Sequence, residues 1–321
     1  MRSNRWGLVG LVVGLVALVI PAYFGNGYQL YLATIALIWL VLVIGLQIIF
    51  GYGGLLSVAH GGLFGLAAYT SGLLNVEKGM PVIQSAVIAI AVTTLVSALI
   101  GLIAVRASGM SFAVLTLAFG AILYELFLNA TDVTGGPLGV VGIEPLPEWS
   151  AWVGVDVRPV LETYITVAVV ACVALLGLWW LVRSEFGRAL VCTREDETLA
   201  ASYGINVRQT RRWAFLISGA FAGLAGVLFG HYFQFIAPES FTFLAAFQAI
   251  VMVVAGGAGI FLGTIVGAIS LSLLPELLRD VSQYQQVTYG VILFLAVRFL
   301  PSGVVGWVRD RIAERRLAAG R

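Results

Sequence analysis

Charged residues are scarce in this sequence. Asp, Glu, Lys and Arg make up 11% of its 321 residues, whereas an ordinary soluble domain carries roughly 25%. A soluble protein needs polar side chains over its whole surface, so the composition argues against one. The distribution excludes it more strongly, because five long stretches contain no charge at all: residues 6–76, 79–105, 163–182, 213–238 and 240–275.

The side chains on which many enzyme sites depend are also scarce. The two histidines, His60 and His231, stand far apart, and no H-E-x-x-H motif or Cys/His cluster occurs. No G-x-S-x-G sequence is present, and Lys78, the only lysine, lies in no P-loop sequence. The sequence therefore predicts a non-catalytic protein without a metal site. We expect no disulfide between Cys172, which falls inside an apolar run, and Cys192.

Apolar residues, by contrast, make up 60% of the chain. About 20 of them in a helix cross the hydrocarbon core of a bilayer. A β-barrel would need short alternating segments instead. We predict an all-α, polytopic transmembrane helix bundle, with one or two spans, the glycine-rich third and the short eighth, broken or re-entrant. Charges and turn residues delimit about ten spans, at 7–24, 28–50, 55–75, 82–105, 109–128, 162–182, 213–235, 241–256, 258–278 and 284–300.

Arginines indicate the orientation, because Lys and Arg collect on the cytoplasmic side. They gather near both ends of the chain, at Arg106 and between residues 183 and 212. Both termini are therefore predicted to be cytoplasmic in a multi-pass protein of the cell inner (plasma) membrane. We retain 7–24 as a span because it lacks a convincing signal-peptide cleavage site. The predicted division is a transmembrane domain at 1–300, with an external loop at 129–161, and a basic cytoplasmic tail at 301–321.

Two of these hydrophilic regions could serve as docking surfaces. The external loop carries four acids and one arginine, and a passive linker and a docking role are both open for it. Within the cytoplasmic segment 183–212, Thr193 is placed to cap a surface helix over 194–204 that Gly204 would end. Ala200 and Ala201 would leave the middle of this helix flat, so it either docks another protein or only links two spans.

Glycines recur at every fourth residue in several spans, a spacing that lets helix backbones approach closely in lipid. Three glycines within residues 51–54 are different, because they break a helix, and non-helical backbone at membrane depth survives only inside protein or beside water. We assign the fourfold glycines to helix packing: Gly61, Gly65, Gly219, Gly223, Gly226, Gly259, Gly263 and Gly267.

Polar residues near this break are candidates for a translocation pathway, since burying them without partners would be costly. For His60, a structural hydrogen bond and a pathway role are both open. The sequence offers few charges here that could hold a charged solute, which favours weak binding in the membrane and recognition by another protein. The predicted pathway residues are Gln47, Tyr52, Gly53, Ser57 and His60.

Several stretches carry a family resemblance. Residues 184–190 read S-E-F-G-R-A-L, 194–197 read R-E-D-E and 200–205 read A-A-S-Y-G-I. Together they resemble the coupling region of branched-chain amino acid ABC permeases, with Asp196 where Asn is common and with Thr198 and Leu199 standing between Glu197 and Ala200. Further motifs match in the same order and extend the resemblance over about 28–300. They are G-Y-G-G-L-L-S-V-A-H at 51–60, T-G-G-P-L-G at 134–139, S-G-A with A-G-L-A-G at 218–226, and G-G-A-G at 256–259. In the first of them, Leu55 and Ala59 depart from the family.

The resemblance implies a permease subunit that moves branched-chain amino acids by alternating access, without a cofactor of its own. It implies four partners: a sister permease in a heterodimer, two ATPase subunits that bind ATP, and an extracytoplasmic binding protein; no nucleic acid is expected. Alternatives are a permease for urea or short-chain amides and an ion-coupled transporter, although the membrane interior is nearly free of acids apart from Glu125 and Glu276, which lie near the edges of their spans. The coupling segment, 183–212, would contact the ATPases through Arg188, Arg194, Glu195, Glu197, Ala200, Ala201 and Gly204.

Overall fold

A computed structural model gives the arrangement of most of the chain. It describes residues 21, 25–107, 109–150, 154, 157–277, 290–291, 294, 298 and 303–319. The predicted first and tenth spans, 7–24 and 284–300, fall almost entirely outside these residues.

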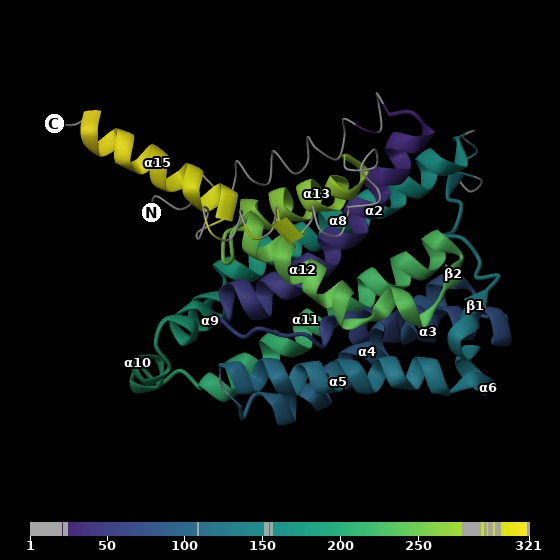
Figure 1. Cartoon of the computed structure of the whole chain (residues 1–321), viewed down its shortest axis with the longest axis horizontal. Coiled ribbons are helices and arrows are strands. Elements are labelled where there is room, and N and C mark those ends of the chain that lie inside the picture. Colours follow the sequence, from purple (N-terminus) through teal and green to yellow (C-terminus); the bar gives the residue numbers. More distant parts are fainter. Residues whose placement is uncertain are drawn as a thin grey trace.

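Long helices dominate the described residues, and most run lengthwise between the left and right ends of Figure 1. Within the described part of the chain, six helical segments are long and apolar enough to cross a membrane. The all-α polytopic fold is therefore confirmed. The seventh predicted span begins earlier than expected, since its helix includes the arginines at 208, 211 and 212. The long helices are α2 (Gly27–Leu46), α3 (His60–Lys78), α4 (Val82–Ala104), α5 (Met110–Asn129), α8 (Pro159–Arg183), α11 (Val207–Phe233), α12 (Phe243–Gly256) and α13 (Phe261–Leu277).

Short elements gather at the two ends of the bundle (Figure 1). One end, named here the α10 end, carries α9 (Glu185–Glu195) and α10 (Glu197–Ser202), and α15 (Gly303–Ala319) projects beyond it. The opposite, strand end carries α6 (Thr131–Thr134), η2 (Gly136–Leu138), β1 (Val140–Val141), β2 (Phe235–Ile236) and η3 (Pro238–Phe241). The external loop thus contains the expected turns and short helix. Its antiparallel pairing of β1 with β2 was not predicted from the sequence.

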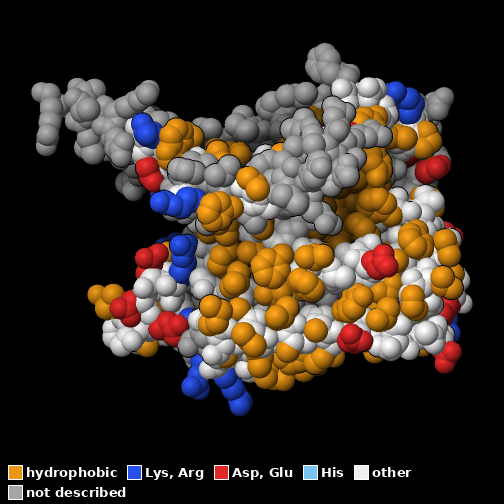
Figure 2. Space-filling view, viewed as in Figure 1, with side chains coloured by type: hydrophobic (Ala, Val, Ile, Leu, Met, Phe, Trp, Pro, Cys, Tyr) orange, Lys and Arg blue, Asp and Glu red, His pale blue; other side chains and the backbone are white. Residues whose placement is uncertain are grey.

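Helices α2 and α11 form the centre of the bundle. In their most apolar windows 78% of α2 and 61% of α11 is buried, against 28%, 22% and 28% for α4, α5 and α8. The outward faces of those three helices expose large apolar residues such as Leu95, Ile122 and Val173. Figure 2 shows hydrophobic side chains over the side of the molecule and most of the visible basic ones at the α10 end. Such an apolar side surface suits contact with lipid.

Glycines lie where neighbouring helices come closest. A Cβ on Gly226 would overlap the Phe64 carbonyl oxygen of α3, and one on Gly61 would lie 2.7 Å from the Thr242 carbonyl oxygen. Gly259 needs a correction, because it lies in the turn between α12 and α13 with a φ of +77° and not on a packed helix face. Tight contacts with side chains or backbone of other segments also occur at Gly65, Gly219, Gly223, Gly263 and Gly267.

A polar network fixes the external loop to the helices at the strand end. The Asn75 side chain donates to Glu144 Oε2 at 2.9 Å and accepts from the Glu144 amide at 2.9 Å. His231 Nδ1 lies 2.7 Å from the Glu144 carbonyl oxygen, and its Nε2 lies 2.7 Å from Ser71 Oγ. A carbonyl only accepts, so in the neutral ring Nδ1 carries the proton and Ser71 donates to Nε2. The network ties the loop to α3 and α11.

The packing around α11 generates a matched pair of substitutions. Gly226→Ala forces α11 away from α3, whereas Gly230→Ala places a Cβ whose nearest neighbour is 3.6 Å away. Overpacking costs about 1–3 kcal/mol, and alanine is the better helix former. We expect Gly226→Ala to lower the melting temperature of the detergent-solubilised protein by about 5 °C and Gly230→Ala to leave it unchanged or raise it. Equal melting temperatures for the two variants would contradict this account of the interface.

Candidate functional site

The helix of the second predicted span ends where the glycines at 51–54 indicated a break. Helix α2 passes into a π-helical stretch, η1 (Gln47–Tyr52), and no helix follows until α3 begins at His60. Gly54 adopts a φ of +71°, a conformation that favours glycine. Figure 1 shows the connecting chain running from the α9 side of the bundle towards α3. The predicted break is confirmed, and single turns of π-helix are frequent at functional sites.

Protein groups satisfy the backbone of this interruption. The Gly53 amide donates to the Ile48 carbonyl at 3.0 Å, and the Leu55 amide donates to the Ile49 carbonyl at 3.0 Å. Further along, the Val58 amide donates to Thr116 Oγ1 of α5 at 3.1 Å. These bonds meet the requirement that backbone at membrane depth finds partners within the protein.

Gln47 joins the interruption to the turn between α12 and α13. Its side chain is fully buried, and its Nε2 donates to the carbonyl oxygens of Gly257 and Ile260, both at 3.2 Å. Its Oε1 has no hydrogen-bond partner among the described residues. Gly51 faces the same amide, since a Cβ there would lie 2.6 Å from Oε1 and 2.8 Å from the Gly259 amide nitrogen. The two segments are therefore in backbone-level contact.

The coupling segment reaches the same place from outside the bundle. Arg194 of α9 donates from Nη1 to the Gly51 carbonyl oxygen at 2.5 Å. Leu190, one turn earlier on α9, is fully buried and lies against Gly53. The interruption, the α12–α13 turn and α9 thus meet at one site, which we name the junction: Gln47, Gly51, Gly53, Gly54, Leu190, Arg194, Gly257, Gly259 and Ile260.

His60 holds a second buried network, deeper in the bundle. Ser218 of α11 donates to the Gly45 carbonyl oxygen of α2 at 2.7 Å, so its oxygen accepts from His60 Nε2 at 2.5 Å. His60 Nδ1 is then the acceptor for the Ser57 hydroxyl at 2.9 Å. The structural hydrogen bond foreseen for His60 is present and links α2, α3 and α11. A role for His60 in the pathway stays a prediction.

The predicted pathway residues lie together around the interruption. Gln47, Tyr52, Gly53, Ser57 and His60 are all buried. They follow one another along the segment from η1 to the start of α3. A route lined by them stays a prediction.

A separate pocket lies nearer the strand end, between α2, α8 and α13. Its volume is about 490 Å³ and its lining is mainly apolar, including Leu32, Ala36 and Leu273, with Gln29 and Tyr164 as polar members. None of the predicted pathway residues lines it.

The cytoplasmic surface helix differs from its prediction. One helix capped by Thr193 was expected over 194–204, but the structure has two helices, α9 and α10, that meet at Asp196. Asp196 caps α10, because its Oδ1 accepts from the amides of Thr198 at 2.8 Å and Leu199 at 2.9 Å. Thr193 donates instead to the Ala189 carbonyl within α9 at 2.8 Å. The stop near Gly204 is confirmed, since α10 ends at Ser202 and Gly204 has a φ of +81°.

The predicted coupling residues divide into inward and outward groups. Ala200 is buried, and Glu197 forms an ion pair with Arg211 of α11, a residue only 7% exposed. Arg188 donates to the Arg183 carbonyl oxygen at 2.9 Å and pairs loosely with Glu185. Arg188, Arg194 and Glu197 are exposed as well as engaged in contacts, and Glu195, Ala201 and Gly204 are exposed too.

Two exposed apolar residues on α10 were missed from the sequence. Tyr203 is 78% and Leu199 56% exposed, and as an i,i+4 pair they lie on one face. Their spacing of four residues in an otherwise polar segment could have predicted an exposed apolar face. The partners of Gln47 in the α12–α13 turn were also missed, and no local pattern points to them.

Comparison with known proteins identifies the family. The family described as "Branched-chain amino acid transport system / permease component" matches residues 28–299. The chain is 32% identical over 332 residues to the high-affinity branched-chain amino acid transport system permease protein LivM of Escherichia coli, covering 97% of this chain and 77% of that protein.

More distant relatives have related names. The permease protein LivH of E. coli is 26% identical over 291 residues, or 85% of this chain and 92% of LivH. BraD of Pseudomonas aeruginosa is 32% identical over 145 residues, covering 44% of this chain and 47% of BraD. No solved structure matches. The fold, the ordered motifs and these relatives agree, and the chain belongs to the permease family of branched-chain amino acid transport systems.

Proposed function

We propose that this chain is a membrane-spanning permease subunit of an ATP-binding-cassette importer for branched-chain amino acids. Two separate ATPase subunits would bind and hydrolyse ATP, and the permease would translocate by alternating access. The observation that carries the proposal is the 32% identity to LivM over 97% of the chain. Charge placement supports it over an ion-coupled carrier, because the buried charged residues among those described are Glu162 and Arg211, each close to one end of the bundle.

A sister permease is the first proposed partner. LivM and LivH of E. coli are two different permease proteins of one kind of transport system, and both are relatives of this chain. The chain is more similar to LivM, at 32% against 26% identity. A heterodimer with a LivH-like subunit is therefore the arrangement that we propose.

The exposed face of α10 is the proposed ATPase contact. Beyond the end of the bundle it presents Leu199 and Tyr203 on one side of this short helix, and Ala201 is exposed on another side. Apolar and aromatic residues at the centre of a polar surface are typical of protein interfaces. Ala200 and Glu197 would support this face from behind, through burial and through the ion pair with Arg211.

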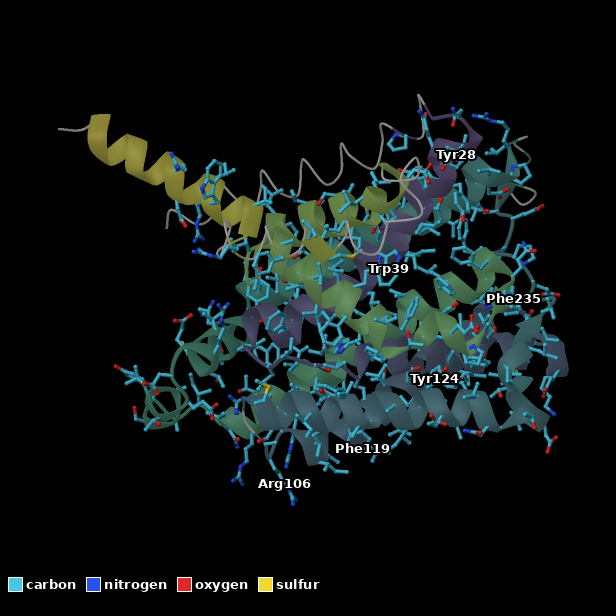
Figure 3. All side chains as sticks on the ribbon, viewed as in Figure 1. Tyr28, Trp39, Arg106, Phe119, Tyr124 and Phe235 are labelled. Carbon is cyan, nitrogen blue, oxygen red and sulfur yellow. The ribbon has the colours of Figure 1, made fainter. Side chains whose placement is uncertain are left out.

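Orientation follows from the distribution of arginines in the structure. Arg106 points away from the bundle at the α10 end, while Tyr28 and Phe235 lie at the strand end (Figure 3). Because basic residues mark the cytoplasmic side, we place the α10 end and both termini in the cytoplasm. The strand end would face outward and receive the binding protein on a surface that includes Leu138 and Val141, which are 84% and 68% exposed.

Reconstitution tests the proposed activity. We expect proteoliposomes that contain this chain, the sister permease, both ATPases and the binding protein to accumulate radiolabelled leucine when ATP is supplied. Omission of the ATPases should abolish uptake, and excess valine should compete while urea and acetamide should not. Uptake driven by an ion gradient without ATP would exclude the proposal, and competition by urea would favour an amide permease.

Enlarging the exposed face of α10 tests the coupling surface. Ala201→Trp adds a large side chain to the exposed surface of α10 and would keep a docked ATPase at a distance, so we expect normal membrane insertion with at least tenfold lower substrate-stimulated ATPase activity, as for disruption of an interface hot spot. Ala201→Ser is the matched control and should behave like the unmodified protein. Ala200→Trp should reduce the yield of folded protein as well, because Ala200 is buried. Normal stimulation in Ala201→Trp would argue against this surface.

A native cysteine tests the orientation. Cys192 is exposed on α9. In the Cys172→Ser background, we expect a membrane-impermeant maleimide to label Cys192 in inside-out vesicles and not in intact cells. Labelling in intact cells would place the coupling segment outside. The Cys192→Ser variant reports the background.

A further inference from the structure

We propose that Arg194 is a positioning residue that fastens the coupling segment to the interrupted part of α2 and to the α12–α13 turn. Through it, a displacement of α9 would move both segments together. The inference rests on the proposed function in one respect, namely that ATPase subunits would displace α9. The fastening itself follows from the geometry of the junction.

Two side chains on one face of α9 seat it on the interruption. Leu190 and Arg194 are one helical turn apart, so they point the same way. A Cβ on Gly53 would lie 3.1 Å from Leu190 Cδ1, and a Cβ on Gly54 would lie 2.8 Å from Arg194 Cγ. The stem of Arg194 therefore lies directly on backbone, in space that any residue other than glycine at position 54 would fill.

The guanidinium group lies in a corner between two backbone segments. Its Nη1 donates to the Gly51 carbonyl oxygen, which is at the end of the π-helical stretch, where fewer following amides are available to a carbonyl. A Cβ on Gly259 would lie 2.7 Å from the same Nη1 and 2.9 Å from the Gly51 oxygen. Glycine at 259 thus leaves the space in which the guanidinium group rests.

Gln47 completes the connection from the other side. Its amide holds the carbonyl oxygens of Gly257 and Ile260, so the turn is tied to the π-helical stretch and that stretch is tied to α9. The ties are side-chain hydrogen bonds, one of them charge-assisted. They can break and form again without unpacking a helix. A junction of this kind can transmit movement of α9 and can also release it.

Arginine suits this position better than lysine. A planar guanidinium group with several fixed donors can lie flat between two backbone segments, whereas an ammonium group is a compact, strongly hydrated charge. Arg194 remains partly exposed along its length, so it lies where the coupling segment, the cytoplasm and the interrupted helix meet.

Hydrogen exchange in the reconstituted permease tests the fastening without any ATPase. We expect Arg194→Ala to speed amide exchange about fivefold in 47–54 and in 256–260, the factor for losing a hydrogen bond of ordinary net strength. Arg194→Lys should give a smaller increase. Arg106→Ala, which removes an exposed arginine at the same end, should leave both segments unchanged. Unchanged exchange at 256–260 in Arg194→Ala would overturn the proposal.

The complete complex tests the positioning role. We expect Arg194→Ala to assemble with its ATPases and to hydrolyse ATP, but to import several-fold less leucine per ATP, with partial rescue by Arg194→Lys. If Arg194→Ala does not insert into the membrane, Arg194→Gln removes the charge and keeps much of the side chain, and we expect it too to import less leucine per ATP. Faster exchange with an unchanged leucine-to-ATP ratio would overturn the positioning role. If the unmodified complex imports no leucine with ATP, the proposed function fails, while the exchange result still decides whether Arg194 fastens the junction.

Discussion

Backbone amides and carbonyls need hydrogen-bond partners wherever water is excluded, and the interrupted stretch between α2 and α3 is where this constraint is most severe. An intact helix would satisfy it alone. Here other elements supply the partners: α5 provides Thr116 to the Val58 amide, and α9 provides Arg194 to the Gly51 carbonyl. Gln47 makes the same kind of connection in the opposite direction, from the interruption to the α12–α13 turn. The unpaired backbone groups of the interruption therefore determine which elements meet at the α10 end. The junction forms because these groups need hydrogen-bond partners.

Properties that are local in the sequence could be predicted, and those that join distant segments could not. Apolar length located helices at the predicted spans from the second to the ninth, six of them among the segments long and apolar enough to cross a membrane, and three glycines at 51–54 located the break. The junction was not foreseen, because Gln47 and its partner Gly257 are 210 residues apart and nothing near either residue indicates the other. The division of the surface helix depends on a smaller choice. Thr193 and Asp196 are both able to cap a helix, and the Thr193 hydroxyl is used inside α9, which leaves the start of α10 to Asp196.

Two kinds of contact hold the bundle, and they differ in how readily they change. Where Gly226 meets Phe64, and where Gly267 meets Met252, side chains are missing and backbones touch, so separation of the helices would open space that nothing else fills. The junction is held by side-chain hydrogen bonds, which exchange more easily. The backbone contact at Gly226 and the network of His231 with Ser71 make α3 and α11 a firm unit. The α12–α13 turn also touches the interruption at Gly51 and Gly259, but the hydrogen bonds that attach it there come from the Gln47 side chain and can break and form again.

Helix α11 runs without a break for 27 residues, a length of about 40 Å. Arg211 near its beginning pairs with Glu197 of α10, and His231 near its end bonds the loop that carries β1. Helix α11 is thus attached to α10 at one tip and to the loop that carries β1 at the other. A tilt of about 5° about its midpoint would shift each tip by roughly 2 Å in opposite directions, given that length. A movement at one end of the bundle would then be transmitted to the other end through α11 alone, without any change in the residues that line the pathway.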